Sequence, residues 1–220
     1  MSKNHDSNFQ LPQWFEGPEA LQVTLREVWE TKYEELYEDD ATDEIYEAFR
    51  SVLAIISEPD SAVSHKRYVY MGLAMALAAR PTLTDRFPQD KRPDFVLQRV
   101  FAWLESGQWE GPEWAELLFA DYWTGAHTEA NEAYDIFRQL LKIININDAY
   151  RALFNILDAA INDEAISPHY WAKRAIFNWW LIDVVPAAYS LRLPATICTD
   201  RGDPVHLTTF SEQSLLSSLT

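Results

Sequence analysis

Three aspartates stand inside otherwise apolar stretches of the sequence, at Asp121, Asp158 and Asp183. Burying a carboxylate is costly unless it is paired, so positions of this kind can mark acid–base or metal chemistry. An enzyme built on them requires the three carboxylates to converge on one interior site. In the structural alternative, each carboxylate lies at the rim of the fold or pairs with a basic residue. For Asp183, that partner must come from another helix, because Lys173 and Arg174 lie about two to three helical turns away.

The histidines and the cysteine offer no further catalytic or metal-binding pattern. The five histidines are scattered through the chain and show no HExxH or Glu-x-x-His spacing. The single cysteine, Cys198, cannot form an internal disulfide. Cys198 and His206 can serve as nucleophile and base only beside an oxyanion site, and the irregular sequence around them supplies none. We therefore expect no catalytic residue, no metal and no cofactor.

Acidic side chains dominate the charge of the chain. The 34 acidic and 18 basic residues give a formal net charge of −16. Residues 1–60 hold fifteen acidic and four basic residues, and residues 105–135 hold eight acidic residues and no basic one. Such a surface repels nucleic acid and anionic lipid and attracts basic proteins, although a charge run is also typical of an ordinary solvated helix face. The residues that we predict to bind a partner are Glu34, Glu35, Glu38, Asp39, Asp40, Asp43, Glu44, Glu110 and Glu113.

The most specific local pattern is a turn with a proline near each end. It reads Phe87-Pro88-Gln89-Asp90-Lys91-Arg92-Pro93. Pro88 and Pro93 restrict the backbone at both ends of the link. Phe87 can bury against the helices that the turn joins, while Asp90 and Arg92 can satisfy helix ends or each other. We predict a rigid corner between two helices.

Apolar residues at helical spacing predict the elements that position these side chains. The stretch from Tyr68 to Ala79 is apolar on every side of a helix, so it must lie at the centre of the core. The helix that contains it is predicted over about residues 61–80, where Pro81 stops it. Before it, Gly17-Pro18 opens a helix, and Thr42 is a candidate N-cap for the next one. The apolar stripe of the first helix is Leu21, Leu25, Val28, Trp29, Leu36 and Tyr37.

Helical spacing continues after the turn. Helices are predicted over about 94–106, around Trp114 to Trp123, from Thr128 to about Ile144, and through Leu153 to Ile161. Ser167-Pro168 then fits the N-cap and first turn of a last helix, which extends to about Pro186. The fold class is therefore all-α, with a single bundle of about eight helices.

The chain divides by composition into three parts. Residues 1–17 form a polar N-terminal arm, 18–190 the helical bundle domain, and 191–220 a C-terminal extension rich in Thr and Ser. In the extension, Ala195–Cys198 and Val205–Phe210 fit two short strands of a hairpin, and a loosely packed, irregular tail fits equally well. The N-terminal residues contain no apolar run of the signal-peptide kind, and the longest apolar run is too short to span a bilayer. We therefore expect a cytoplasmic protein.

Residues 64–107 combine three features that together resemble a known family. His65-Lys66-Arg67 head an apolar helix, the Phe87-Pro88-x-Asp90-x-Arg92-Pro93 turn follows, and a second apolar helix ends with Trp103-Leu104-Glu105-Ser106-Gly107. This arrangement is similar to that of all-helical bacterial immunity proteins of polymorphic toxin systems. The resemblance implies a helical fold and neutralisation of a cognate toxin by direct binding. The shared pattern marks the fold, so no toxin contact is carried over to individual residues.

We therefore expect a non-catalytic acidic helical binding protein, of immunity type, that holds a basic protein through its acidic surface. Nucleic acid and membranes are not expected partners, because the charge repels both. Two alternatives remain open: an enzyme with a buried carboxylate site, and a structural or assembly protein that self-associates through exposed Trp. The oligomeric state is not predicted.

Overall fold

The structure is a computed structural model that describes residues 9–57, 61–109, 118–119, 130–145, 147–162, 165–166, 169, 172–198 and 204–206. These residues form an all-α bundle, which confirms the predicted fold class. The α-helices are α1 (Glu19–Glu30), α2 (Ile45–Ile56), α3 (Ser61–Arg86), α4 (Arg92–Ser106), α6 (Asn131–Ile143), α7 (Ala149–Leu157), α8 (Lys173–Trp179) and α9 (Val185–Tyr189). A 3₁₀ turn, η1 (Glu34–Leu36), follows α1, and two π-helical segments, η4 (Asp158–Asn162) and η6 (Trp180–Val184), extend α7 and α8.

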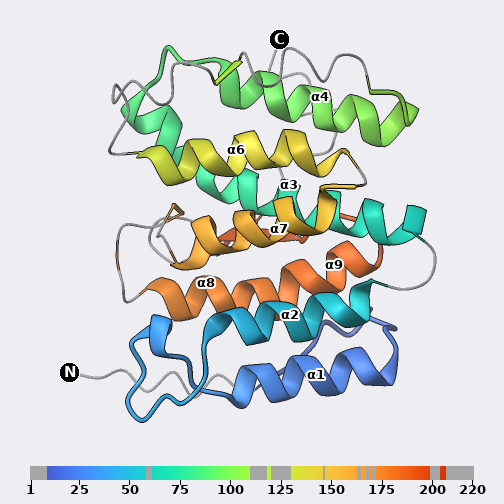
Figure 1. Ribbon diagram of the computed structural model, residues 1–220, viewed down its shortest axis with the longest axis vertical. Coiled ribbons are helices and arrows are strands. Elements are labelled where there is room, and N and C mark those ends of the chain that lie inside the picture. Colours follow the sequence, from blue (N-terminus) through green and yellow to red (C-terminus); the bar gives the residue numbers. More distant parts are fainter. Residues whose placement is uncertain are drawn as a thin grey trace.

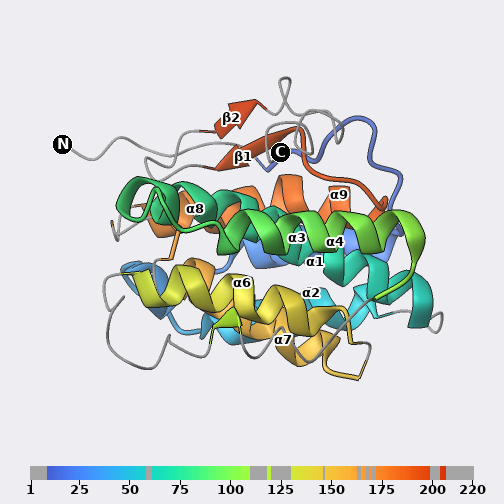
Figure 2. The same cartoon turned by 90° about the horizontal axis from the view of Figure 1, so that it is seen from above.

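The helices lie side by side in two layers. One layer contains α4, α3, α8–α9 and α1, and the other contains α6, α7 and α2, so that successive helices along the stack alternate between the layers (Figures 1 and 2). α3 contacts α4, α6, α7 and α9, which places it at the centre of the stack. All residues from Met71 to Ala79 are buried, as the all-round apolar sequence predicts.

A glycine allows the two layers to approach closely at the centre. A Cβ placed on Gly72 of α3 would lie 3.1 Å from the Cδ1 atoms of Ile143 and Ile156 and 3.3 Å from that of Leu140. These three side chains come from α6 and α7. The absence of a side chain at Gly72 therefore sets the distance at which α3 crosses the opposite layer.

The prediction that Pro81 stops the central helix is wrong, because α3 continues to Arg86. A proline inside a helix removes one backbone hydrogen bond and crowds the carbonyl four residues earlier, at a cost of about 3 kcal/mol or more. Here the last turns remain helical because burial extends beyond the proline. Leu83 is only 1% exposed, and the Thr84 hydroxyl donates to the Pro81 carbonyl at 3.3 Å.

Like α3, the helix near the end of the bundle contains a proline. α8, η6 and α9 follow one another from Lys173 to Tyr189, with Pro186 in the first turn of α9. The helix therefore extends three residues beyond the predicted end. The wider π-helical turn precedes the proline, where it relieves the crowding that the ring would cause in a regular α-helix. The predicted start at Ser167-Pro168 lies outside the described residues.

The first and last described segments pack on the bundle. β1 (Thr196–Cys198) pairs antiparallel with β2 (Pro204–His206), with Ile197 opposite Val205. This hairpin, one of the two predicted alternatives, lies on the outer face of α8–α9, away from α6 and α7 (Figure 2). In the N-terminal arm, Phe15 is 8% exposed and joins the core. Residues 207–210 of the predicted second strand lie outside the described part.

Candidate functional site

The loop between α1 and α2, residues 31–44, carries most of the acidic residues that were predicted to bind a partner. We call this segment the acidic loop. α1 ends at Glu30, so the predicted continuation of its apolar stripe to Leu36 and Tyr37 is wrong. Tyr37 and Asp40 both have left-handed backbone angles, with φ of 58° and 60°. Such angles are uncommon outside glycine, so the loop follows one tightly specified path.

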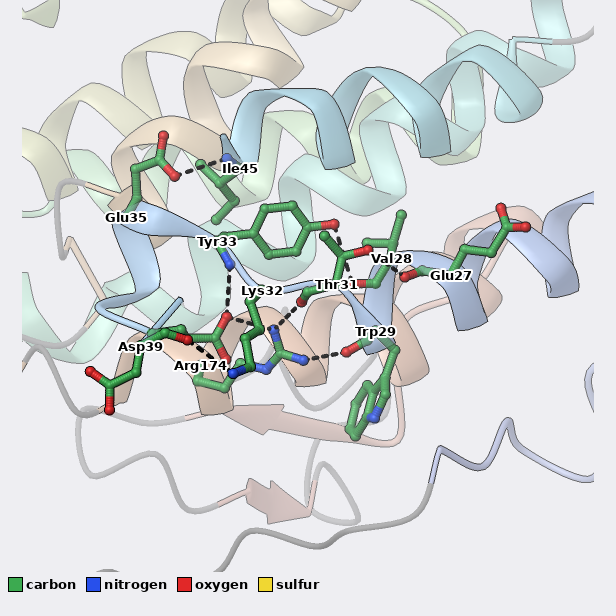
Figure 3. Close-up of polar contacts among 11 residues, drawn as sticks. Glu27, Val28, Trp29, Thr31, Lys32, Tyr33, Glu35, Asp39, Ile45 and Arg174 are labelled. Atoms are coloured by element: carbon green, nitrogen blue, oxygen red, sulfur yellow. Dashed lines mark hydrogen bonds and ion pairs between the residues drawn. The ribbon is translucent and has the colours of Figure 1, made fainter. Parts of the chain in front are cut away.

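Side chains satisfy the carbonyl groups at the end of α1, because no glycine cap follows it. The Thr31 hydroxyl donates to the Glu27 carbonyl at 2.8 Å, and the Tyr33 hydroxyl donates to the Val28 carbonyl at 3.3 Å (Figure 3). Burial is the main cause that raises the pKa of Tyr33 to about 12, with Thr31 and Arg174 opposing it. Tyr33 is therefore neutral and remains a donor at physiological pH.

Arg174 of α8 completes this cap from the other end of the sequence. Its guanidinium donates to the Trp29 carbonyl and to the Thr31 carbonyl at 3.3 Å (Figure 3). It also donates to Glu38 Oε2 at 3.3 Å. Burial lowers the pKa of Arg174, and Glu38 opposes that change. A cation at a helix C-terminus also interacts favourably with the helix dipole.

Two of the predicted partner-binding residues are occupied with contacts inside the protein. Glu38 accepts from the Tyr33 backbone N–H at 2.9 Å as well as from Arg174, and its side chain is 22% exposed. Glu35 accepts from the Ile45 backbone N–H at 2.9 Å and so caps α2 from ten residues upstream. The predicted N-cap, Thr42, is wrong. Glu44 holds that position, and the Thr42 hydroxyl bonds Asp43 instead.

The other acidic residues of the loop are exposed to solvent, as is a tyrosine between them in sequence. Glu34, Asp39, Asp40, Asp43 and Glu44 are all exposed. Tyr37 is 65% exposed, the largest value among the exposed large hydrophobic residues of the described chain, and the ammonium of buried Lys173 lies 4.9 Å from its ring centre. Sequence reasoning placed Tyr37 on the buried stripe and missed Lys173 and Arg174. The run of carboxylates on both sides of Tyr37 was the signal that it faces solvent.

Three of the predicted positions lie outside the described residues: Glu110, Glu113 and Asp121. The acidic segment 105–135 is therefore described only at its ends and at residues 118–119, and the acidic loop is the part of the predicted surface that the structure positions.

The two remaining interior aspartates have different partners. Asp158, the first residue of η4, accepts from the Tyr46 hydroxyl at 2.9 Å and from the Asn162 amide at 3.2 Å. Asp183 of η6 lies against the hairpin, where burial raises the pKa of its carboxyl with a smaller opposing effect from Thr196. The two carboxylates thus belong to separate polar contacts rather than to one shared site.

The predicted corner at Phe87–Pro93 is a hydrogen-bonded unit. Asp90 accepts from the backbone N–H of Arg92 at 2.9 Å, from its guanidinium at 2.6 Å and from the Tyr134 hydroxyl at 2.6 Å. The Phe87 ring lies 5.9 Å from that of Tyr134, and Pro93 falls in the first turn of α4, which begins two residues earlier than predicted. The corner connects α3, α4 and α6 and has a structural role.

The comparisons add no relative to this description. No family model, curated protein or solved structure matches the chain. Among the described residues, no group of three or more His, Cys, Asp or Glu side chains is arranged to hold a metal ion. In the same part of the chain, no helix is both long enough and apolar enough to span a bilayer.

Proposed function

We propose that this protein is a non-catalytic binding protein that engages a basic protein through the acidic loop. The observation that carries the proposal is that five exposed carboxylates share one short loop with Tyr37, which is 65% exposed. Complementary charge steers a basic partner toward such a surface, and Tyr is among the residue types that contribute most to binding energy at protein interfaces.

The fixed conformation of the loop supports the same function. Glu35 caps α2, Glu38 bridges Tyr33 and Arg174, and the Lys32 ammonium donates to the Asp39 carbonyl at 2.9 Å. Because these contacts already order the loop, binding would cost little further conformational entropy. The immunity-type role, with a toxin as the basic partner and the cytoplasm as the site of action, rests on the family resemblance of residues 64–107 and is the narrower form of this proposal.

Charge reversal on the loop tests the proposal. The variant Glu34→Lys, Asp39→Lys, Asp43→Lys changes exposed carboxylates and leaves the buried contacts in place. The control variant, Glu19→Lys, Asp85→Lys, Glu105→Lys, changes the net charge equally at exposed positions outside the loop. Each tagged protein is used as bait in its native host, and captured proteins are quantified by mass spectrometry. We expect a basic protein that the unmodified and control proteins capture and the loop variant does not.

Purified components then give the affinity of that pair. An equal affinity of the captured protein for the loop variant and the control variant would rule out the acidic loop as the binding surface. Capture of acidic or neutral proteins alone would contradict the proposed charge of the partner.

A further inference from the structure

One turn of α8 makes several side-chain contacts with the acidic loop. Arg174 reaches Thr31 and Glu38, the Lys173 ammonium lies against the Tyr37 ring, and the Phe177 ring lies 5.3 Å from that of Tyr33 in an edge-to-face arrangement. Other side-chain hydrogen bonds connect the loop to α1 and to the start of α2, its neighbours in sequence. Within the described residues, this turn of α8 is where a hydrogen-bonded ion pair, a cation–π contact and a ring contact join the loop to the second half of the chain.

The Arg174 guanidinium donates to three oxygen atoms at this site, which we call the oxygen cradle. The carbonyls of Trp29 and Thr31 belong to the end of α1, and the Glu38 carboxylate belongs to the far side of the loop. The planar, forked guanidinium can bond all of these acceptors at once, which a lysine ammonium on a flexible stem does less well. Glu38 also accepts from the Tyr33 backbone N–H, so the contact with Arg174 fixes the backbone path of the loop.

We propose that Arg174 acts as a latch on the acidic loop. The loop opens and closes as a unit while the bundle stays folded, and the Arg174 guanidinium determines the fraction of molecules in which the loop is closed. Without the guanidinium, the Trp29 and Thr31 carbonyls lose this donor and Glu38 loses its counter-ion. Tyr33 and Leu36 are then the loop's main buried anchors, at 3% and 5% exposure. The inference concerns the loop itself and holds whether or not the loop binds a basic protein.

Hydrogen exchange measured by NMR on the full chain tests the latch. Three backbone amides report on the closed loop: Tyr33 N–H bonded to Glu38, Glu34 N–H bonded to the Asp43 carbonyl, and Ile45 N–H bonded to Glu35. In the unmodified protein we expect these amides to exchange faster than those of α3, because a unit that opens locally is less protected than the core. In Arg174→Ala their exchange should accelerate by about ten-fold or more, the effect of removing a hydrogen-bonded charged group, while α3 stays protected. The control Arg151→Ala removes an exposed guanidinium from α7 and should change none of them.

Chemical rescue identifies the group that acts as the latch. Guanidinium chloride at millimolar concentration should slow exchange at the three loop amides of Arg174→Ala by occupying the empty cradle, and potassium chloride at equal ionic strength should not. The latch is disproved if the loop and α3 amides exchange with equal protection in the unmodified protein, or if Arg174→Ala affects both equally. A failure of guanidinium to restore protection would overturn the assignment to the oxygen cradle. Each of these outcomes is independent of any partner.

Discussion

The Tyr134 hydroxyl donates a hydrogen bond of 2.6 Å to Asp90 across 44 residues of sequence. Asp90 lies in the turn between α3 and α4, and Tyr134 lies on α6 in the opposite layer. Burial alone would raise the pKa of Asp90, but hydrogen bonds from Arg92 and Tyr134 outweigh it and hold that pKa below its usual value. The contact therefore joins the corner to α6. The local sequence specifies the corner, but it does not specify the position of α6.

Replacing Tyr134 with Phe should destabilise the bundle without unfolding it. The substitution removes the hydroxyl and leaves Asp90 bonded to Arg92 only, at an expected cost of about 1–2 kcal/mol in the free energy of unfolding. Urea denaturation followed by circular dichroism measures this difference. The control Tyr150→Phe removes a hydroxyl from a side chain that is 44% exposed and should change stability by less than about 0.5 kcal/mol. Equal stability of the two variants would show that the Asp90 contact contributes nothing.

Replacing Asp183 with Asn should stabilise the protein at neutral pH. The pKa of Asp183 is raised in the folded state by burial, so the native state binds its proton more tightly than the unfolded state does. The stability that this proton contributes is complete below the unfolded pKa of about 3.9 and is lost as pH rises through the folded value. Asn is uncharged at every pH and of similar shape. The variant should therefore be more stable than the unmodified protein at pH 7, and the gain should disappear near pH 3 in urea titrations.

A larger side chain at position 72 should separate the two layers. Gly72→Ala adds a methyl group that the ends of three flexible side chains can accommodate, and the gain of about 1 kcal/mol in helix propensity offsets part of the crowding. Gly72→Leu adds a branched side chain where no space exists, at an expected cost of about 3 kcal/mol or more. Thermal unfolding should therefore place the Ala variant close to the unmodified protein and the Leu variant well below it. A Leu variant of unchanged stability would contradict the close crossing of α3 with α6 and α7.

Two neighbouring glutamates should differ in their effect on stability. Glu35→Ala removes the acceptor that caps Ile45 of α2 and should cost about 1 kcal/mol, the typical contribution of an N-terminal cap. Glu34→Ala changes an exposed residue and should stay within about 0.5 kcal/mol of the unmodified protein. Glu35→Gln keeps an acceptor and should recover part of the loss. Denaturant titrations of the three variants distinguish a capping role for Glu35 from a general effect of charge.

The sequence by itself determined the fold class, the central helix and the corner. The stretch Tyr68–Ala79 is apolar on every side of a helix and therefore has to be buried on every side. The Phe87–Pro93 turn contains two prolines that restrict its backbone, and an Asp90–Arg92 pair that bonds within the turn. Both predictions rest on patterns among residues that are close in sequence, which a single chain displays directly. The same local reasoning fails at Pro81, because burial of the residues after it outweighs the local preference to end the helix.

Only the tertiary structure decided which acidic residues face solvent. Glu35 and Glu38 look like the other carboxylates of the loop in sequence, but their partners are the first backbone N–H of α2 and a guanidinium 136 residues away. Tyr37 fits an apolar stripe only if α1 continues to it. The helix instead ends at Glu30, where Thr31, Tyr33 and Arg174 satisfy its carbonyls. The direction of a side chain on an irregular loop depends on the donors and acceptors that folding brings beside it, and these come from parts of the chain that no local pattern connects.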